Sequence, residues 1–268
     1  MSQDKSEVSA YWNKSSCGEA VFLEETDRTG YLQQSESRYQ VEPYILDFAQ
    51  FERYKGLHVL EIGVGLGADH QKFAEAGAIA YGIDLTTRAI EHTKRRFRFF
   101  GLESQLLVGD AEYLPFPDNY FDLIYSWGVL HHTPDTKKAV CEIFRVLKSG
   151  GEAKIMLYHK QSIVGYLLWI RYAVARLKPL TSLSKLFSQH LESPGTKAFS
   201  ISEANVLLER FKDLKIKVAL SDGDLLMQHT GLDHAGWTLS VAKKCWPRKT
   251  IRRFFSKNGL FMLISCRK

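Results

Sequence analysis

Short apolar runs and segments of helical periodicity alternate along the middle of this chain. From Leu57 onward, each short run of mainly apolar residues is followed by a stretch in which apolar side chains recur every three or four positions. This alternation is typical of a doubly wound α/β fold, in which helices cover both faces of a mostly parallel sheet. The pattern predicts five strands, at residues 57–62, 79–83, 105–108, 121–126 and 152–158. It also predicts helices at residues 66–76, 87–100 and 135–147, with a glycine C-cap in residues 148–151.

The segment before this core is rich in aromatic residues. Residues 39–51 have a helical pattern of apolar positions, so we expect residues 1–50 to form an N-terminal helical cap. A helical segment in this place can close over a cofactor pocket, and a packed N-terminal arm is the alternative. The core itself is expected at residues 51–160.

A very apolar helical segment, residues 162–178, follows the core. Its uninterrupted apolar run from Ile163 to Ile170 is far shorter than the ~20 residues of a transmembrane helix. We therefore expect a helical insertion or lid at residues 161–212, lying over the active edge of the sheet or against a membrane surface. Ser200 is expected to cap a second helix there, ending near Phe211.

The rest of the chain, residues 213–268, is predicted to hold the last two strands. They are expected at residues 214–220 and 260–266, joined by a long loop. A connection of that length needs either a function or structure of its own.

Positive charge is concentrated near the C-terminus. The chain has 268 residues and a formal net charge of +6, and nine Lys or Arg but no Asp or Glu lie between Lys243 and Lys268. We interpret this basic segment as a solvated face, with an acidic substrate or a phospholipid surface as the minority interpretation. Peripheral contact with the inner face of a membrane is thus a secondary expectation.

The cysteines and the first residues favour a reducing compartment. The four cysteines lie far apart and form no CxxC pair, which argues against a zinc site or a disulfide framework. Residues 1–7 are polar and lack the apolar region of a signal peptide. We expect a cytoplasmic protein.

A glycine-rich turn predicts a nucleotide-type cofactor site. Gly63, Gly65 and Gly67 follow the first strand, and the helix that begins after them offers unpaired N–H groups to a ligand. Asp84 ends the second strand 21 residues after Gly63, where a carboxylate can accept both ribose hydroxyls. Because Gly63-x-Gly65-x-x-Ala68 also satisfies a permissive dinucleotide fingerprint, a nicotinamide or flavin enzyme is an alternative.

Two acidic residues favour a cationic nucleoside over a dinucleotide. Glu61 lies inside the first strand, where it would repel a pyrophosphate but could attract a positive charge. Asp110 follows the third strand and suits the edge of an adenine. A sulfonium nucleoside would tolerate both.

Successive motifs in residues 59–151 resemble those of class I S-adenosylmethionine-dependent methyltransferases, above all the small-molecule and quinone type. They are Val-Leu-Glu-Ile-Gly-Val-Gly-Leu-Gly (59–67), Gly-Ile-Asp-Leu-Thr (82–86), Gly-Asp-Ala-Glu-Tyr-Leu-Pro-Phe-Pro-Asp-Asn-Tyr-Phe-Asp (109–122), Gly-Val-Leu-His-His-Thr-Pro-Asp (128–135) and Arg-Val-Leu-Lys-Ser-Gly-Gly (145–151). The resemblance covers about residues 55–158 and is weak outside them. It implies a Rossmann-like sheet of seven strands whose last strand, at residues 260–266, is antiparallel.

The resemblance implies S-adenosylmethionine as cofactor and S-adenosylhomocysteine as product. In this family the glycine turn lies under the methionine part, the acid after strand two holds the ribose, and the Asp after strand three contacts adenine. The expected cofactor-binding residues of this chain are Glu61, Gly63, Val64, Gly65, Gly67, Asp84, Leu85, Asp110, Ala111, Ser126 and Trp127.

Acceptor-site residues are predicted at strand ends and in the N-terminal segment. Three histidines, His132, His131 and His159, are candidate bases, needed only if the acceptor must lose a proton before attack. Tyr11, Trp12, Tyr39 and Tyr158 are candidate substrate contacts. We expect no metal, because adjacent histidines point apart and no third ligand stands at helical spacing.

The sequence therefore predicts an S-adenosylmethionine-dependent methyltransferase acting on a small, hydrophobic or lipid-like acceptor by in-line displacement. Positioning and exclusion of water would be the main contribution of the protein. DNA is not expected as a partner, because the fourth strand lacks the turn of amino-methylating DNA enzymes and no strand-end cysteine is present. RNA methylation is a disfavoured alternative, and a non-catalytic S-adenosylmethionine-binding or nucleotide-binding module is another. The acceptor atom and the oligomeric state are left open.

Overall fold

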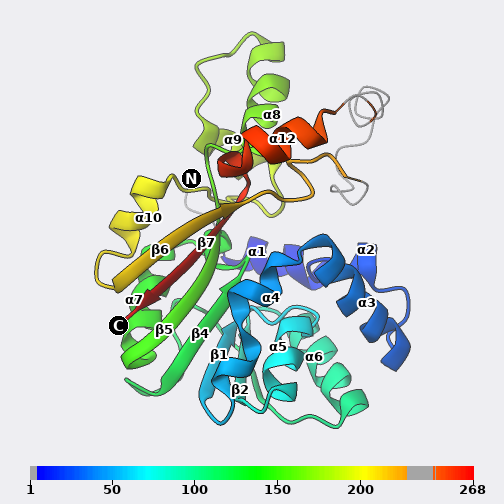
Figure 1. The fold of residues 1–268 in the computed structure, drawn as a ribbon, viewed down its shortest axis with the longest axis vertical. Coiled ribbons are helices and arrows are strands. Elements are labelled where there is room, and N and C mark those ends of the chain that lie inside the picture. The colour runs from blue at the N-terminus through cyan, green and yellow to red at the C-terminus, as the bar shows by residue number, and fades with distance from the viewer. Residues whose placement is uncertain (1–4, 228–243, 245) are drawn as a thin grey trace.

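A seven-stranded sheet forms the centre of the computed structural model, which describes residues 5–227, 244 and 246–268 (Figure 1). The strand order is β3-β2-β1-β4-β5-β7-β6. The strands are β1 (His58–Ile62), β2 (Ile79–Asp84), β3 (Gln105–Val108), β4 (Phe121–Trp127), β5 (Leu147–Tyr158), β6 (Lys212–Ala219) and β7 (Phe261–Arg267). The chain reverses direction across the sheet after β3, which places a switch point between β1 and β4.

Only β7 runs against the other strands of this sheet as the structure describes it. Its register pairs Tyr158 with Phe261 on one side and Ala219 with Phe261 on the other, both antiparallel. The remaining neighbours pair in parallel. The predicted class of fold, with an antiparallel last strand and a helical insertion after the fifth strand, is confirmed.

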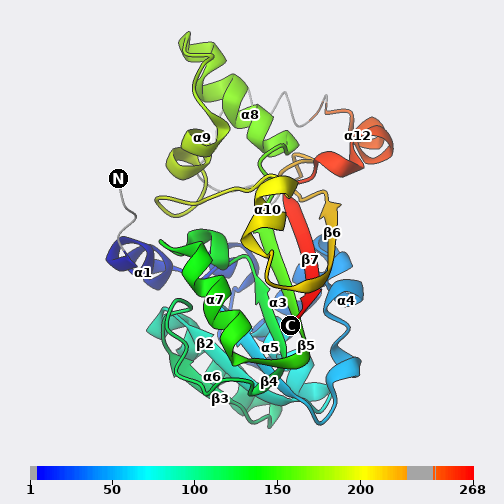
Figure 2. The ribbon, with the colours of Figure 1, turned by 90° about the vertical axis from the view of Figure 1, so that its left-hand side faces the viewer.

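Helices cover both faces of the sheet because the central strands are apolar on both sides (Figure 2). On one face, Leu60 and Ile124 pack under α7 (Thr136–Val146) and α10 (Ile201–Leu207). On the other face, Val59 and Leu123 pack against other helices. These are α4 (Tyr44–Ala49), η1 (Phe51–Tyr54) and α5 (Ala68–Glu75), with α6 (Thr87–Phe100) beside α5.

Side-chain caps start several of these helices where the sequence predicts them. The hydroxyl of Ser200 accepts a hydrogen bond from the amide of Glu203, whose carboxylate accepts one from the Ser200 amide, and α10 begins there. The helix ends at Leu207, four residues before the predicted end near Phe211. The Asp135 carboxylate caps α7 by accepting a hydrogen bond from the Lys138 amide.

Two local predictions were wrong. The helix predicted at residues 39–51 is divided, because α3 (Arg28–Val41) ends before Pro43 and α4 begins after it. The glycines of residues 148–151 do not cap α7, which ends at Val146 and passes through extended Leu147 directly into β5. Long-range pairing with β4 and β7 replaces the local C-cap there.

The N-terminal segment and the insertion lie at the carboxyl ends of the strands. The N-terminal segment contains α1 (Lys5–Lys14), α2 (Glu19–Phe22) and α3. After β5 the chain leaves the sheet and forms α8 (Ile163–Tyr172), η3 (Val174–Arg176) and α9 (Leu183–His190), which project from the body of the molecule (Figure 1). Between β6 and β7, the described part contains α12 (Arg248–Phe254) and η4 (Ser256–Asn258). Within the described residues, no helix has the length and apolar character needed to span a membrane.

A buried ion pair fixes α3 to the sheet. The guanidinium of Arg38 donates two hydrogen bonds to the Asp69 carboxylate, at 2.7 and 3.0 Å. The hydroxyls of Tyr39 and Tyr125 donate to the same carboxylate, at 3.0 and 2.9 Å. Burial would raise the pKa of Asp69, but Arg38 and these hydroxyls outweigh it and lower the pKa.

We expect Asp69→Asn to lower the free energy of unfolding by roughly 3 kcal/mol, because it removes the main carboxylate partner of half-buried Arg38 and leaves only Glu42, at 3.4 Å. Chemical denaturation at neutral pH measures this. Because the pKa of Asp69 is lowered, its contribution to stability is fully present at a pH above the ordinary pKa of a carboxyl group. This contribution is lost as the pH falls through the lowered pKa of Asp69. The curves of variant and wild type should therefore converge in acid.

Glu75→Gln on the same helix is the matched control. Glu75 pairs with Lys72 at the surface, at 3.1 Å, and both side chains are more than a third exposed. Its loss should change the stability by no more than about 1 kcal/mol. Equal losses in the two variants would contradict the special role of Asp69.

Candidate active site

The glycine turn after β1 forms a tight, open cradle. Gly63, Gly65 and Gly67 all have positive φ angles, of 83°, 53° and 77°. A Cβ atom on Gly63 would lie 2.0 Å from Val129 Cγ2, and one on Gly67 would lie 2.9 Å from Thr93 Oγ1. A Cβ atom on Gly65 would meet nothing within 4 Å. Protein atoms therefore occupy the space beside two of these glycines, whereas the space beside Gly65 is open to a ligand.

Asp84 lies at the end of β2, directly beside this turn. One carboxylate oxygen accepts a hydrogen bond from the Gly65 amide at 3.2 Å, and the other accepts bonds from the amide and hydroxyl of Thr86. Burial raises the pKa of Asp84 overall, although the hydrogen bonds from Thr86 and Gly65 act to lower it. Asp84 and the glycine turn thus lie side by side, and their roles in binding the cofactor stay predictions.

Asp110, after β3, is paired with a residue of the N-terminal helix α1. Lys5 Nζ lies 2.6 Å from an Asp110 oxygen and 2.6 Å from a Glu112 oxygen. Desolvation lowers the pKa of Lys5, but the hydrogen bonds and charges of the two carboxylates raise it overall. Helix α1 therefore closes the adenine end of the predicted cofactor site through an ion pair.

Glu61 is buried under the turn. Its carboxyl contacts His70 Nδ1 at 3.1 Å, and His70 Nε2 contacts the Ser104 hydroxyl at 2.7 Å. Burial raises the pKa of Glu61, with Asp69 adding to the effect, and it lowers the pKa of His70 to about 3. Since Ser104 donates its own hydrogen to the Ala80 carbonyl, a protonated Glu61 and a neutral His70 satisfy this chain of bonds.

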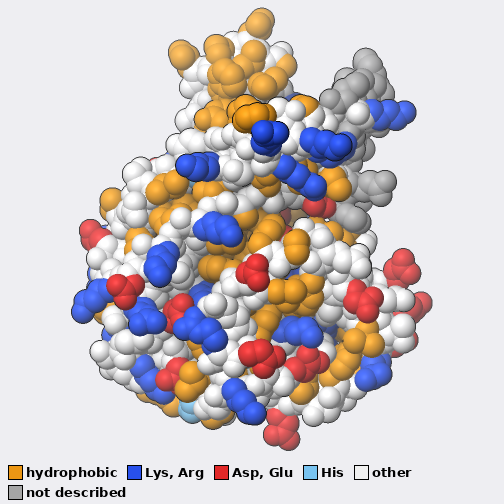
Figure 3. Space-filling model, in the orientation of Figure 1, with side chains coloured by type: hydrophobic (Ala, Val, Ile, Leu, Met, Phe, Trp, Pro, Cys, Tyr) orange, Lys and Arg blue, Asp and Glu red, His pale blue; other side chains and the backbone are white. Residues whose placement is uncertain are grey.

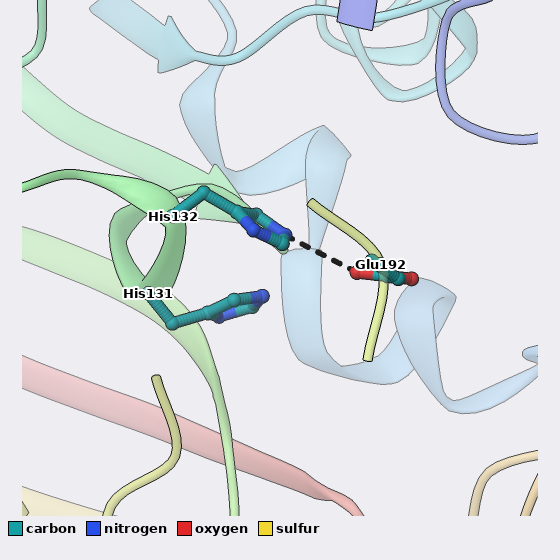
Figure 4. Close-up of side chains that lie close together, drawn as sticks. All are labelled: His131, His132 and Glu192. Carbon is teal, nitrogen blue, oxygen red and sulfur yellow. Dashed lines mark ion pairs between the residues drawn. The ribbon is translucent and has the colours of Figure 1, made fainter. Parts of the chain in front are cut away.

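A cluster of polar side chains lies beyond the ends of β4 and β5 (Figure 4). His132 Nε2 lies 3.2 Å from a Glu192 oxygen, and the Tyr158 hydroxyl donates to the same oxygen at 2.8 Å. The Ser193 and Thr196 hydroxyls contact His132 Nδ1 at 2.8 and 3.0 Å. Burial, with Glu192 adding to it, raises the pKa of Tyr158, so this phenol stays a hydrogen-bond donor.

His131 is buried beside this cluster with both ring nitrogens lacking a hydrogen-bond partner among the described residues. Its ring stacks on that of Tyr158, with centroids 3.8 Å apart, and both histidine rings point toward Glu192 (Figure 4). Burial lowers the pKa of His131, and neighbouring His132 and Lys197 add to this. Ser126 Oγ, at the end of β4, is also buried without a partner in the described part of the chain.

The fold adds a third donor to the two histidines. Donor atoms of His131, His132 and Glu192 lie within 4.8 Å of one another. Glu192 lies 60 residues away in the sequence, so helical spacing could not reveal it. The arrangement suits proton transfer between imidazole and carboxylate, and the expected absence of a metal stays a prediction.

The predicted aromatic contacts divide into two groups. Trp12 packs edge-on against His132 with ring centroids 5.3 Å apart, and Tyr11 packs against Trp12. Tyr39, in contrast, donates to Asp69 and belongs to the buried ion pair. Trp127 lies among Tyr44, Phe48 and Phe261, with Arg38 over its ring at 5.9 Å.

The remaining predicted residues lie around the turn and the strand ends. Val64 and Ala111 are buried, and Leu85 is half-buried directly after Asp84. His159 is buried, and its Nδ1 lies 3.2 Å from the Gly259 carbonyl. The candidate base roles of the three histidines stay predictions.

Several site residues gave no signal in the sequence. Glu192, Ser193 and Thr196 belong to an irregular segment after α9, and Glu192 has a positive φ of 52°. The Cys17 thiol is exposed to solvent, yet desolvation raises its pKa to about 12, with Glu192 adding to this.

Several acidic side chains surround Glu42. Burial raises the pKa of Glu42 to about 7, with Arg38 opposing it and with Asp69, Asp222 and Glu192 adding to it. The same surroundings include Asp84, which acts on Cys17. An interior with many carboxylates and one buried guanidinium favours a cationic ligand.

The strand order, the left-handed glycine turn and the acid after β2 define the Rossmann-like class of nucleoside-binding methyltransferase folds. Residues 60–155 match the family model described as a methyltransferase domain. Residues 60–155 thus have the sequence pattern of a methyltransferase domain, and the sheet around them has the fold of class I S-adenosylmethionine-dependent methyltransferases.

Sequence relatives agree with this assignment. The chain is 31% identical over 159 residues to demethylmenaquinone methyltransferase of Tropheryma whipplei (strain Twist), covering 58% of this chain and 65% of the relative. It is 34% identical over 125 residues to sterol 24-C-methyltransferase erg6 of Aspergillus fumigatus, covering 42% of this chain and 33% of the relative. The chain thus spans less than two thirds of the length of either relative.

A solved structure agrees in fold over the whole chain. Haemonchus contortus phosphoethanolamine N-methyltransferase 2, in complex with phosphomonomethylethanolamine and S-adenosylhomocysteine, superposes with a TM-score of 0.62 and 19% identity. The match covers 100% of this chain and 60% of that one. At this identity the likeness concerns the fold alone.

We expect Gly65→Ala to weaken S-adenosylhomocysteine binding by at least about tenfold, because the new methyl group would project into the open cradle. Isothermal titration calorimetry measures the affinity. The left-handed backbone at this position should also lower the stability by about 1 kcal/mol.

Gly150→Ala separates these two effects. Gly150 also has a positive φ, 77°, and a Cβ there would also meet nothing within 4 Å. It lies near the start of β5, at the edge of the sheet opposite to the carboxyl ends of the parallel strands. This control should lose similar stability and keep its affinity. Equal affinities of the two variants would place the cofactor elsewhere.

We expect Asp84→Asn to lower the affinity for S-adenosylhomocysteine by roughly 10- to 100-fold, since hydrogen bonds to a charged group contribute ~1.5–3 kcal/mol. Asn keeps the shape and one acceptor oxygen for the turn. Asp118→Asn, an exposed carboxylate paired with Arg145, is the control and should bind normally. Undiminished binding by Asp84→Asn would show that this carboxylate does not hold the ribose.

Proposed function

We propose that this protein transfers a methyl group from S-adenosylmethionine to a small, hydrophobic or lipid-like acceptor. The observation that carries the proposal is the pairing of an open glycine cradle with the His132–Glu192 cluster at the same edge of the sheet. The named activities of the quinone and sterol relatives support a lipid-like acceptor.

The residues of the cradle fit this cofactor. Asp84 would hold the ribose, Asp110 the adenine edge, and the glycine turn the methionine portion. When bound, S-adenosylmethionine supplies a methyl group already activated by a sulfonium. The acidic side chains around Glu42 would favour the positive charge of the sulfonium. The protein then needs to orient the acceptor and exclude water.

The His132–Glu192 pair is our candidate for the base. The Thr196 hydroxyl donates to the Ser193 carbonyl at 2.6 Å, which leaves its lone pairs to accept a hydrogen from His132 Nδ1. In that tautomer Nε2 carries the lone pair that would take the proton of an acceptor hydroxyl, and Glu192, 3.2 Å from Nε2, would stabilise the resulting imidazolium. The deprotonated acceptor oxygen would then be the nucleophile for the methyl group that bound S-adenosylmethionine supplies.

A panel assay tests the acceptor class. The protein is incubated with methyl-labelled S-adenosylmethionine and a demethylated naphthoquinol, a sterol, a long-chain fatty acid or phosphoethanolamine. We expect label in one of the three apolar compounds and none in phosphoethanolamine. Labelling of phosphoethanolamine or of added RNA alone would overturn the lipid-like acceptor, and cofactor binding without any transfer would favour a binding module.

We expect His132→Gln to lower kcat with the naphthoquinol by about 10²–10⁴-fold while the affinity for S-adenosylhomocysteine changes little. Glu192→Gln should lower kcat less, because only the stabilisation of the imidazolium is lost. His159→Gln serves as the comparison, since His159 contacts Gly259 and not this cluster. A larger loss of kcat in His159→Gln than in His132→Gln would move the base to His159.

A further inference from the structure

The end of the molecule beyond the carboxyl edge of the sheet exposes many large apolar side chains. This projecting end comprises residues 163–190 and 246–258, and both views place its two parts at the same end of the long axis (Figures 1 and 2). Leu177 and Leu180, in the outermost turn, are 90% and 98% exposed. Tyr166, Ile170 and Val174 are also exposed, as are Phe254 at the end of α12 and Phe255 directly after it.

Internal hydrogen bonds hold the outermost turn in this shape. The indole of Trp169 donates to the Pro179 carbonyl at 3.1 Å, and the Lys178 amide donates to the Ala173 carbonyl at 2.8 Å. Leu177 itself adopts a left-handed backbone, with φ of 57°. Holding a leucine in the left-handed region, with its side chain in water, costs stability. Such a cost suggests that the exposed side chain has a function.

The charge of the projecting end has one sign. Residues 163–190 contain four Lys or Arg, residues 246–258 contain five, and neither range contains Asp or Glu. Arg171, Arg252 and Arg253 are exposed on α8 and α12. Apolar side chains gather at this end in the space-filling view, with basic ones beside them, whereas acidic and basic side chains are interspersed over the rest of that face (Figure 3).

We propose that the projecting end docks on an anionic phospholipid bilayer. Leu177 and Leu180 would enter the acyl region, while the surrounding Arg and Lys side chains would contact lipid phosphates. A partner protein would satisfy the apolar side chains, but the uniform positive charge over two separate segments fits a uniformly negative surface best. Because α8 follows the end of β5, docking would bring the His132 cluster near the lipid.

Cosedimentation of the full chain with lipid vesicles tests the docking. We expect binding to vesicles of phosphatidylcholine with phosphatidylglycerol, weaker binding to phosphatidylcholine alone, and release at high salt. The double variant Leu177→Ser with Leu180→Ser should bind about tenfold less or weaker still. Leu46→Ser with Val206→Ser, which changes two exposed residues elsewhere, should bind normally.

A second pair of variants tests the charge. Arg252→Glu with Arg253→Glu should abolish the preference for phosphatidylglycerol, whereas Lys212→Glu with Lys215→Glu on β6 should keep most of it. Absence of vesicle binding by the wild type, or equal losses in test and control variants, would overturn the proposal. A third outcome would also overturn it. In that case sedimentation velocity would show a wild-type dimer, and the leucine substitutions would dissociate this dimer without reducing vesicle binding.

These outcomes are independent of methyl transfer. The vesicles contain no methyl acceptor, so binding can be present in a protein that transfers nothing. If no acceptor in the panel is methylated but vesicle binding is intact, only the proposed function is rejected. If an apolar acceptor is methylated but the vesicles are not bound, only the docking is rejected.

Discussion

The close approach of the glycine turn to the chain after β4 is the constraint on which the site depends. A Cβ at Gly63 would overlap Val129, so this contact exists only because the residue has no side chain. Val129 immediately precedes the short helix η2 (Leu130–His132), which carries both histidines. One steric condition therefore positions the cofactor cradle and the polar cluster relative to each other, at the switch point between β1 and β4.

Segments far apart in the sequence complete the site on this frame. Helix α1 brings Lys5 to the carboxylates after β3, and the insertion after β5 brings Glu192, Ser193 and Thr196 to His132. Each of these contacts joins a peripheral segment to a strand end through charge or hydrogen bonds more than through apolar packing. Such contacts can open without disturbing the core, which suits segments that must admit a cofactor and an acceptor.

The electrostatics of the interior follow from the same arrangement. Glu42, Asp69, Asp84 and Glu192 lie near enough to influence one another, and Arg38 is their principal buried counter-charge among the described residues. Burial raises the pKa of Glu61, while Arg38 and two hydroxyls lower the pKa of Asp69. The pKa values of two acids eight residues apart in the sequence thus shift in opposite directions because their partners differ.

The sequence by itself determined the sheet, the glycine turn and the acids after strands two and three, because these depend on local periodicity and on spacing within βα units. It also determined the basic character of the C-terminal segment. Only the tertiary structure decided that Tyr39 serves the Asp69 ion pair, that Glu192 completes the histidine cluster, and that Leu177 is 90% exposed. Those relations join residues distant in the chain, and no local pattern encodes which distant side chain fills a given place.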